Sequence, residues 1–468
     1  MTEKWKSISL ARLFNPKTIA VIGASNKNAK LGGLTLLALE DFKGEIYPVN
    51  PRLSDINGLH CYNNLSEIHQ HIDLAIIALQ APLVKQALED CRKVGVSAAI
   101  IFSAGFSELG EIGVLAQSEI KEIADQGEIA VIGPNCLGAG NVNADLNATF
   151  FPMPVFPKKG KTALISQSGG VAGLMIYGAA DSDLGISKFA SVGNRVNVEF
   201  SDLLQYFESD PETRVVCIFV EGTEKGREMY SAMKEITREK PLVVYKVGKT
   251  PVSRSAARSH TGSLAGDAKI YSAAFRQAGA IEVDNVQEMM DTAKVLSFFP
   301  KAQRGNRVAI VTHTLGPALI AAQILEQSGI RLPSPNDEIA MEIQKILDMP
   351  VDINISNPID LLAQGWANPE IFFKAFELAY ESGDYDSIMT VFSPNYQEDI
   401  GGGMPVQYIL DVVDGDEKCV IAILNSPESR YPPGRREFEE GGIPVFSSPE
   451  RAAKALARVL SRANSRLQ

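Results

Sequence analysis

The sequence predicts an α/β protein in which parallel strands alternate with helices in three successive units. Each unit opens with a short, largely apolar run of the kind found in buried parallel strands, namely Thr18–Ile22, Thr162–Ile165 and Arg307–Val311. A turn of small residues and then a helical pattern follow each run. We therefore expect each unit to form a doubly wound sheet with helices on its faces.

The first unit contains further segments with clear strand and helix patterns. Strands are expected at residues 45–49, 74–79, 98–102 and 130–132, and helices at residues 82–94 and 113–126. Two segments with the composition of linkers, Phe150–Lys161 and Pro300–Asn306, separate the three units. These boundaries predict domains at residues 1–149, 160–300 and 305–462.

The second and third units resemble each other, and we interpret them as an internal repeat. Near the start of the two units, Ala163–Ala172 aligns with Ala309–Ala318. Near their ends, Phe275–Gly279 aligns with Phe438–Gly442, and a short strand and a last helix follow in both. The two units are therefore expected to be structural copies of one another.

Two polar features belong to only one copy of the repeat. Glu221, just after a strand, aligns with Pro394. The loop Ser259–Gly266, which contains His260, aligns with a segment at residues 425–434 that has no His. A residue that the fold requires would be expected in both copies. The difference therefore favours a functional role for Glu221 and His260.

Composition and charge exclude several classes of protein. The formal net charge is −11 at pH 7 and the basic residues are dispersed, which disfavours binding to the phosphates of a nucleic acid. No segment approaches ~18 uninterrupted apolar residues, and the polar start of the sequence lacks the apolar core of a signal peptide, so we expect a cytoplasmic protein. The five cysteines are scattered without a C-x-x-C pair, which indicates buried free thiols and no metal site.

Glycine turns at strand ends predict a phosphate-containing ligand in the first unit. The turn Gly23–Ser25 follows the first strand, where the backbone can approach a phosphate. The second strand leads into Asn50 and Arg52, where a site for NAD would have an acidic residue. A cation there suits a ligand with an extra phosphate, either NADP or coenzyme A; the alternative is a plain glycine turn. The candidate residues are Gly23, Ala24, Ser25, Asn26, Asn50, Arg52, Ser103 and Gly105.

Two other turns and the His loop carry candidate chemical groups. Asn135 could hydrogen-bond an acyl carbonyl, although Asn is also common in tight turns. Ser168, Gly169 and Gly170 follow a strand and open a helix, an arrangement that binds anions; a simple helix cap by Ser168 is the alternative. His260 lies among small polar residues typical of an exposed loop, where it could act as base, ligand or nucleophile, or could be a solvated side chain without a role.

Together these motifs resemble those of the nucleoside-diphosphate-forming acyl-CoA synthetases, and most of all those of the α subunits of ADP-forming acetyl-CoA synthetases, relatives of succinyl-CoA synthetase. The resemblance covers nearly the whole chain in order and implies a Rossmann-like CoA-binding domain followed by two flavodoxin-like domains. It rests on the segments Gly23–Ser25, Val49–Arg52, Ser103–Phe106, Gly133–Gly138, Ser166–Gly169, Val192–Asn194, Val220–Gly222 and Ser259–Gly266.

The resemblance also implies a reaction and a partner. Acyl-CoA, phosphate and ADP would give a carboxylic acid, CoA and ATP, reversibly, through an acyl phosphate and a phosphohistidine. In this sequence His260 would take the phosphoryl group, Glu221 would orient the imidazole, and the helix start at Ser168 would bind phosphate. The ATP-grasp domains of the family are not seen here, which implies a partner β subunit that binds ADP or ATP and Mg, in a hetero-oligomer of α2β2 type.

Some positions depart from the family pattern. Asn197 stands where the family usually has Asp, and His313 lies in a turn that is usually richer in glycine. We interpret His313 as a turn residue rather than a substrate contact. These departures leave the acyl group open among acetate, a branched or aromatic acid and a dicarboxylate.

Two functions other than acyl-CoA synthesis are compatible with part of the sequence. A non-enzymatic scaffold that senses CoA or acyl-CoA would share the domains, but the presence of His260 together with Glu221 argues against it. An NADP-linked oxidoreductase is supported only by the first domain.

Titration with coenzyme A and with NADP distinguishes the two ligands that suit Arg52. Coenzyme A is expected to bind, and Arg52→Glu is expected to weaken its binding by about tenfold or more, because a charge-assisted bond to phosphate is replaced by repulsion. Isothermal titration calorimetry measures both affinities. Tighter binding of NADP than of coenzyme A would contradict the family assignment.

Overall fold

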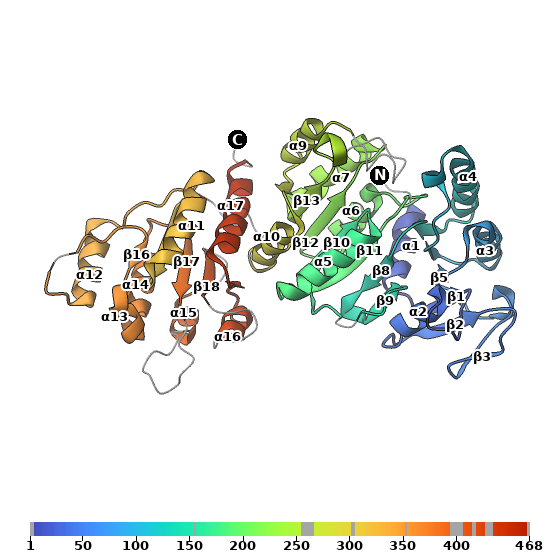
Figure 1. Ribbon diagram of the computed structural model, residues 1–468, viewed down its shortest axis with the longest axis horizontal. Coiled ribbons are helices and arrows are strands. Elements are labelled where there is room, and N and C mark those ends of the chain that lie inside the picture. The colour runs from blue at the N-terminus through green and yellow to red at the C-terminus, as the bar shows by residue number, and fades with distance from the viewer. Residues whose placement is uncertain are drawn as a thin grey trace. The chain divides into compact units, whose positions relative to one another are not determined.

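The computed structural model describes residues 4–153, 156–253, 266–300, 305–351, 353–393, 406–413, 418–425 and 434–465. The chain forms two compact units, Met1–Ala293 and Lys294–Gln468 (Figure 1). His260 lies outside the described residues. Among the helices of the described residues, none has the length and apolar character needed to span a bilayer.

The first sheet has five parallel strands in the order β2-β1-β5-β6-β7. Nearly all side chains of β1, β5, β6 and β7 are buried, as is typical of parallel strands with both faces covered, and this explains why the apolar runs locate them correctly. The edge strand β2 is only partly buried. The elements are α1 (Lys4–Phe14), β1 (Thr18–Ile22), α2 (Leu31–Ala38), β2 (Glu45–Val49), β3 (Asp55–Ile56), β4 (Leu59–His60), η1 (Leu65–Glu67), β5 (Leu74–Ile77), α3 (Ala81–Val94), β6 (Ala98–Ile101), η2 (Ser107–Leu109), α4 (Glu111–Gln126) and β7 (Ala130–Ile132).

The second sheet belongs to the same compact unit and has the order β14-β13-β12-β10-β11-β8-β9. Its elements are β8 (Gly138–Asn141), η3 (Val142–Ala144), β9 (Leu146–Thr149), β10 (Lys159–Ser166), α5 (Gly169–Asp181), β11 (Ile186–Ser191), α6 (Phe200–Ser209), β12 (Val215–Val220), α7 (Gly226–Glu239), β13 (Leu242–Lys246), α9 (Ala268–Gln277), β14 (Ile281–Val283) and α10 (Val286–Phe298).

The hairpin at residues 138–149 differs from the sequence expectation. The sequence places it in the first domain, whereas β8 pairs antiparallel with β11 of the second sheet, and β9 pairs with β8. An apolar pattern shows that a segment is buried but not which distant strand it pairs with, so the pattern could not reveal this. The division into three domains at residues 1–149, 160–300 and 305–462 stays a proposal.

The third sheet has the order β16-β15-β17-β18-β19. Its strands are β15 (Val308–Thr312), β16 (Ile359–Asp360), β17 (Ser387–Phe392), β18 (Cys419–Leu424) and β19 (Val445–Phe446). The helices are α11 (Leu315–Gln327), α12 (Asp337–Leu347), α13 (Leu362–Ala367), α14 (Pro369–Glu381), α15 (Val406–Val412), α16 (Arg435–Glu440) and α17 (Pro449–Ser465).

Topology and matching helix ends confirm the internal repeat. The parallel strands of the second and third sheets have the same order, β11-β10-β12-β13-β14 and β16-β15-β17-β18-β19, which is that of flavodoxin-like sheets. Gly279 and Gly442 both have left-handed φ values, of 76° and 92°. The amide after each glycine donates to the carbonyl of Phe275 or Phe438. Both copies therefore end this helix with the same glycine-dependent cap.

Asn197 fastens the first sheet to the second. Its side chain is buried, accepts a hydrogen bond from the amide of Val131 at 2.9 Å, and donates to the carbonyl of Ile129 at 2.9 Å and to Asp125 at 3.0 Å. An Asp could replace the acceptor but would lose both donors. The neighbours of Asn197 thus explain its departure from the family pattern.

Candidate active site

The residues predicted to bind coenzyme A include a group at the carboxyl edge of the first sheet. The amides of Gly23 and Ala24 donate to the carbonyl of Val49 at 3.0 and 3.3 Å, and the side chain of Asn50 donates to the carbonyl of Ala24 at 2.8 Å. These bonds join the turn after β1 to the turn after β2. A β-carbon at Gly23 would lie 2.8 Å from the carbonyl oxygen of Ala78, and its φ is 87°, so the turn requires glycine.

The other residues of this group surround the same turn. The hydroxyl of Ser25 accepts a hydrogen bond from the amide of Lys27 at 3.0 Å, and the amide of Arg52 donates to the side chain of Asn50 at 2.9 Å. Asn26 and Arg52 are exposed to solvent. The two turns therefore present a half-buried glycine backbone and an exposed cation, which is the combination that a phosphate-bearing ligand needs.

The backbone amide of Gly105 is less available to bind a ligand than the sequence suggests. Its amide donates to the carboxylate of Glu108 at 2.6 Å, and that carboxylate also receives bonds from the amide of Phe106 and the side chain of Asn194. Burial acts to raise the pKa of Glu108, but these three donors outweigh it and hold the pKa below its usual value. A charged carboxylate thus already occupies the amide that was predicted to face a ligand.

The turn Gly133–Leu137 connects the first sheet to the second and is held from several sides. The amides of Asn194 and Val196 donate to its first two carbonyls at 2.9 and 3.0 Å, and the amide of Asn135 donates to the carbonyl of Ser103 at 2.9 Å. The hydroxyl of Ser191 accepts from the amide of Leu137 at 3.1 Å. Asn135 has a positive φ of 58°, a conformation that Asn tolerates better than most residues.

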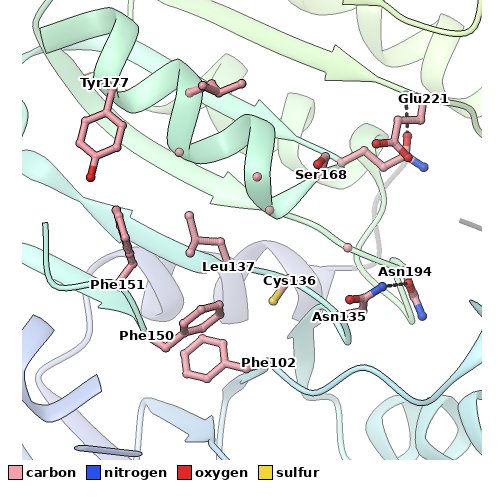
Figure 2. A pocket seen from close by; sticks show the side chains of 16 residues that line it. Phe102, Asn135, Cys136, Leu137, Phe150, Phe151, Ser168, Tyr177, Asn194 and Glu221 are labelled. Carbon is pink, nitrogen blue, oxygen red and sulfur yellow. Dashed lines mark hydrogen bonds between the residues drawn. The ribbon is translucent and has the colours of Figure 1, made fainter. Parts of the chain in front are cut away.

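A pocket of about 500 Å³ opens beside this turn within the first compact unit (Figure 2). It brings together Asn135, Ser168, Gly169, Gly170 and Glu221, which the sequence analysis named as catalytic or as phosphate- and acyl-binding. The residues that line it are Phe102, Asn135, Cys136, Leu137, Phe150, Phe151, Gln167, Ser168, Gly169, Gly170, Gly173, Leu174, Tyr177, Gly193, Asn194 and Glu221.

The pocket lies at the point where the strand order of the second sheet reverses. Strands β11 and β12 lie on opposite sides of β10, and the pocket residues Gln167 and Glu221 directly follow β10 and β12. Open α/β sheets bind ligands at the carboxyl ends of strands at such a position. The location of the pocket therefore follows from the topology.

Gln167 fixes the backbone at Glu221. Its side-chain carbonyl accepts hydrogen bonds from the amides of Glu221 and Gly222 at 2.8 and 3.1 Å. The buried ammonium of Lys246 donates to the carbonyl of Glu221 at 2.7 Å. Glu221 itself is 8% exposed. Its backbone is held at the amide by Gln167 and at the carbonyl by Lys246.

The start of α5 supplies groups that suit an anion. The first amides of a helix have no acceptor within the helix and carry its positive dipole end. Here Gly169 and Gly170 form that first turn on the wall of the pocket. Ser168 also caps the helix, as the alternative interpretation holds. Its hydroxyl accepts a hydrogen bond from the amide of Val171, but the distance of 3.4 Å is long for such a bond. The cap and the anion site therefore use the same residue.

The third sheet repeats this arrangement with different chemistry. Ring nitrogen Nε2 of His313, just after β15, accepts a hydrogen bond from the amide of Ser393 at 3.0 Å. Burial lowers the pKa of His313, which keeps the ring neutral and able to accept. The structural counterpart of Glu221 is therefore Ser393. The sequence alignment paired Glu221 with the next residue, Pro394, and Pro394 lies outside the described residues. This copy still lacks the carboxylate.

The other candidate groups are the cysteines, a metal site and His260. All five cysteines are buried free thiols. Burial raises the pKa of Cys136, the one in the pocket, to about 12, so it is a neutral thiol rather than a nucleophilic thiolate. Within the described part of the chain, no group of three or more His, Cys, Asp or Glu side chains is placed to hold a metal ion. The catalytic assignment of His260 falls on a residue outside that part.

Several residues of the pocket were not singled out by the sequence. Phe150 and Phe151 line it although the sequence assigns them to a linker, and β10 begins within that segment, at Lys159. Gln167 lies inside the Ser166–Gly169 motif, but the sequence analysis assigned the anion site only to the neighbouring Ser168, Gly169 and Gly170. The alignment of Gln167 with His313, another side chain able to accept a hydrogen bond, was the signal that could have identified it.

Two family models match the chain. A CoA binding domain matches residues 17–141, and a succinyl-CoA ligase like flavodoxin domain matches residues 159–296. The two matched domains are thus those of CoA-binding proteins of the succinyl-CoA ligase type.

Relatives extend this match over nearly the whole chain. ADP-forming acetate–CoA ligase I of Archaeoglobus fulgidus is 37% identical over 97% of this chain, which spans 63% of that protein's length. The α subunit of ADP-forming acetate–CoA ligase II of Pyrococcus furiosus is 34% identical over 97% of both chains.

A solved structure agrees with these relatives. The dinucleotide-forming acetyl-coenzyme A synthetase 1 of Ca. Korarchaeum cryptofilum, solved in complex with phosphate and ADP, has a TM-score of 0.86 and 32% identity, covering 98% of this chain and 97% of that one. The chain belongs to the family of ADP-forming acetate–CoA ligases and matches α subunits of that family.

Proposed function

We propose that the chain is the α subunit of an ADP-forming acyl-CoA synthetase. It would convert acyl-CoA, phosphate and ADP reversibly into a carboxylic acid, CoA and ATP. The pocket carries the proposal, because it joins Asn135 at the edge of the first sheet to Ser168 at the start of α5 and to Glu221. The names of the relatives support the reaction type.

In the first step, a phosphate oxygen attacks the thioester carbonyl. A carbon–oxygen bond forms, the carbon–sulfur bond breaks, and the electron pair leaves with the sulfur, giving an acyl phosphate and CoA. The first amides of α5 and the hydroxyl of Ser168 bind the phosphate, and the side chain of Asn135 donates to the carbonyl oxygen as charge develops there. The turn Gly23–Ser25, with Asn50 and Arg52, holds the nucleotide part of CoA.

In the second step, His260 takes the phosphoryl group. A neutral ring nitrogen attacks phosphorus, a nitrogen–phosphorus bond forms, and the bond from phosphorus to the acyl oxygen breaks to release the carboxylate. Glu221 accepts a hydrogen bond from the protonated nitrogen of the ring and so sets the tautomer. The fixed backbone of Glu221 suits this role, because an orienting group must itself be held.

The last step needs a site for ADP that this chain is not proposed to supply. The partner is an ATP-grasp β subunit in an α2β2 assembly, and ADP, ATP and Mg bind mainly to it. There the phosphoryl group passes from His260 to ADP, so that the nitrogen–phosphorus bond breaks as the new oxygen–phosphorus bond forms. Phosphoryl transfer of this kind depends on positioning more than on covalent assistance.

Replacing His260 tests the proposed function. His260→Ala is expected to abolish phosphate-dependent formation of ATP from acyl-CoA, because the nucleophile is lost, and to abolish labelling of the protein by ³²P-phosphate. His69→Ala, which alters an exposed histidine of the first sheet's domain, is expected to leave both unchanged. Full ADP-linked activity in His260→Ala would contradict the proposal. CoA binding by the complete complex without any phosphohistidine would favour the sensing scaffold instead.

A further inference from the structure

We propose that the acyl group of the substrate is apolar and the size of an aromatic ring, as in an arylacetyl group, rather than an acetyl or dicarboxylic acyl group. The inference rests on the proposed function and specifies its substrate. It depends on the side chains, the volume and the charge of the pocket.

Aromatic side chains form one end of the pocket. Phe102 and Phe150 make an edge-to-face pair with ring centres 5.1 Å apart, and Phe151 and Tyr177 make a second such pair at 6.0 Å. The exposed side chain of Leu174 adds to this apolar surface. Apolar ring surface of this kind suits contact with another ring or a branched chain.

The polar groups lie at the other end. Figure 2 shows Ser168, Glu221, Asn135 and Asn194 on one side, and Tyr177, Phe151, Phe150 and Phe102 on the other. A ligand that reacts at the polar end therefore extends its remaining atoms toward the rings. This division fits a reacting carboxyl group that carries an apolar body.

The volume exceeds what the smallest substrate needs. Phosphate and an acetyl group have eight non-hydrogen atoms together, and at roughly 30 Å³ each, the share of a water molecule, they fill about 240 Å³. The pocket measures about 500 Å³. The described residues therefore leave room beyond phosphate and an acetyl group, of which a six-membered ring at the same share per atom takes about 180 Å³.

The charge of the described lining disfavours a second carboxylate. The described residues that line the pocket include no Lys, Arg or His, while Glu221 is already an acid. A dicarboxylic acyl group would bury its free carboxylate among these residues without a cation from them, which is unfavourable.

A substitution at Gly173 can be used to fill part of the pocket. It lines the pocket in the middle of α5, and a β-carbon placed there would meet no atom within 4 Å. The β-carbon of a leucine at this position would therefore meet no protein atom, and its branched end would take up space in the pocket. Gly226, the first residue of α7, has equally open space but lies away from the pocket, which makes Gly226→Leu the matched control.

The test compares acyl-CoA substrates with the α chain and its partner subunit assembled. We expect kcat/KM for phenylacetyl-CoA, in the ADP- and phosphate-dependent reaction, to exceed that for acetyl-CoA and succinyl-CoA by about tenfold. Gly173→Leu is expected to lower the ratio of phenylacetyl-CoA to acetyl-CoA turnover by about tenfold, and Gly226→Leu to leave the ratio unchanged.

The outcomes separate this inference from the proposed function. Preference for acetyl-CoA or succinyl-CoA, or an equal loss with all thioesters in Gly173→Leu, would overturn the inference while leaving the ligase reaction in place. Absence of ADP-dependent turnover with every thioester would overturn the proposed function itself.

A second inference comes from an independent observation, the side-chain amide of Gln167. We infer that its Nε2 group binds an oxygen atom of the reacting phosphate. Gln167 is 3% exposed and lines the pocket, and its Nε2 has no hydrogen-bond partner among the described residues. A buried donor without an acceptor is costly and uncommon, which indicates a ligand that supplies the acceptor.

The orientation of this amide is fixed. Its oxygen accepts from the amides of Glu221 and Gly222, and turning it over would point its NH₂ group at those two donors. The fold itself needs only the acceptor, because His313 fills the same place in the third sheet with a ring nitrogen. The NH₂ group of Gln167 is thus available for another task, beside the anion-binding start of α5.

Gln167→Glu separates the two tasks. The carboxylate keeps an acceptor for both backbone amides but replaces the donor by an oxygen that repels phosphate. We expect kcat/KM for phosphate to fall by about 100-fold, as when a single oxyanion donor is removed, with the affinity for CoA and the urea midpoint close to those of the wild type. Gln167→Met, whose thioether is a weak acceptor and carries no donor, is expected to act in the same direction and serves if the Glu variant does not fold.

His313→Gln is the matched control and is expected to leave kcat/KM for phosphate unchanged. Wild-type use of phosphate in a folded Gln167→Glu or Gln167→Met variant would overturn the inference. A loss in kcat/KM for phosphate that is matched by an equal loss of CoA affinity would also overturn it, because it would indicate a general disturbance of the site.

Discussion

The architecture of the site depends on one short turn that leaves the first sheet and enters the second. β7 ends at Ile132 and β8 begins at Gly138, so five residues connect strands of two different sheets. Asn194 and Val196 hold the carbonyls of this turn, and neither sheet can shift without moving it. A side chain at Gly193 would lie 2.2 Å from the carbonyl oxygen of Pro134, which shows how closely the two segments approach. The proposed thioester and phosphate sites are brought together by this constraint.

The repeat separates a contact that the fold needs from the groups proposed to be functional. In both copies, the residue after the first strand accepts a hydrogen bond from the backbone after the third strand, through Gln167 in one and His313 in the other. Only the copy built on the second sheet combines this acceptor with a carboxylate. There the residue whose amide donates to the acceptor is Glu221, and in the third sheet it is Ser393. The chemical difference between the copies therefore lies in side chains, while the backbone arrangement is common to both.

The sequence was informative where burial or backbone geometry leaves a local pattern. The strands of the first sheet and the glycine turn at Gly23 follow from apolar runs and from the need for positive φ. The pairing of the hairpin at residues 138–149 with β11 depends on a distant strand, and no local pattern records it. The aromatic wall was missed because Phe150 and Phe151 stand in a proline-rich segment, and only the fold brings them to the pocket.

The proposed chemistry requires the acyl thioester and phosphate to meet in the pocket between the first and second sheets. A crystal structure of the assembled α and β subunits with phosphate and an unreactive thioether analogue of phenylacetyl-CoA would show where the two ligands bind. We expect the sulfur beside Asn135, the phosphate at Ser168 and Gln167, and the ring against Phe151 and Tyr177. An analogue with its acyl end outside this pocket, or phosphate bound away from α5, would rule this arrangement out.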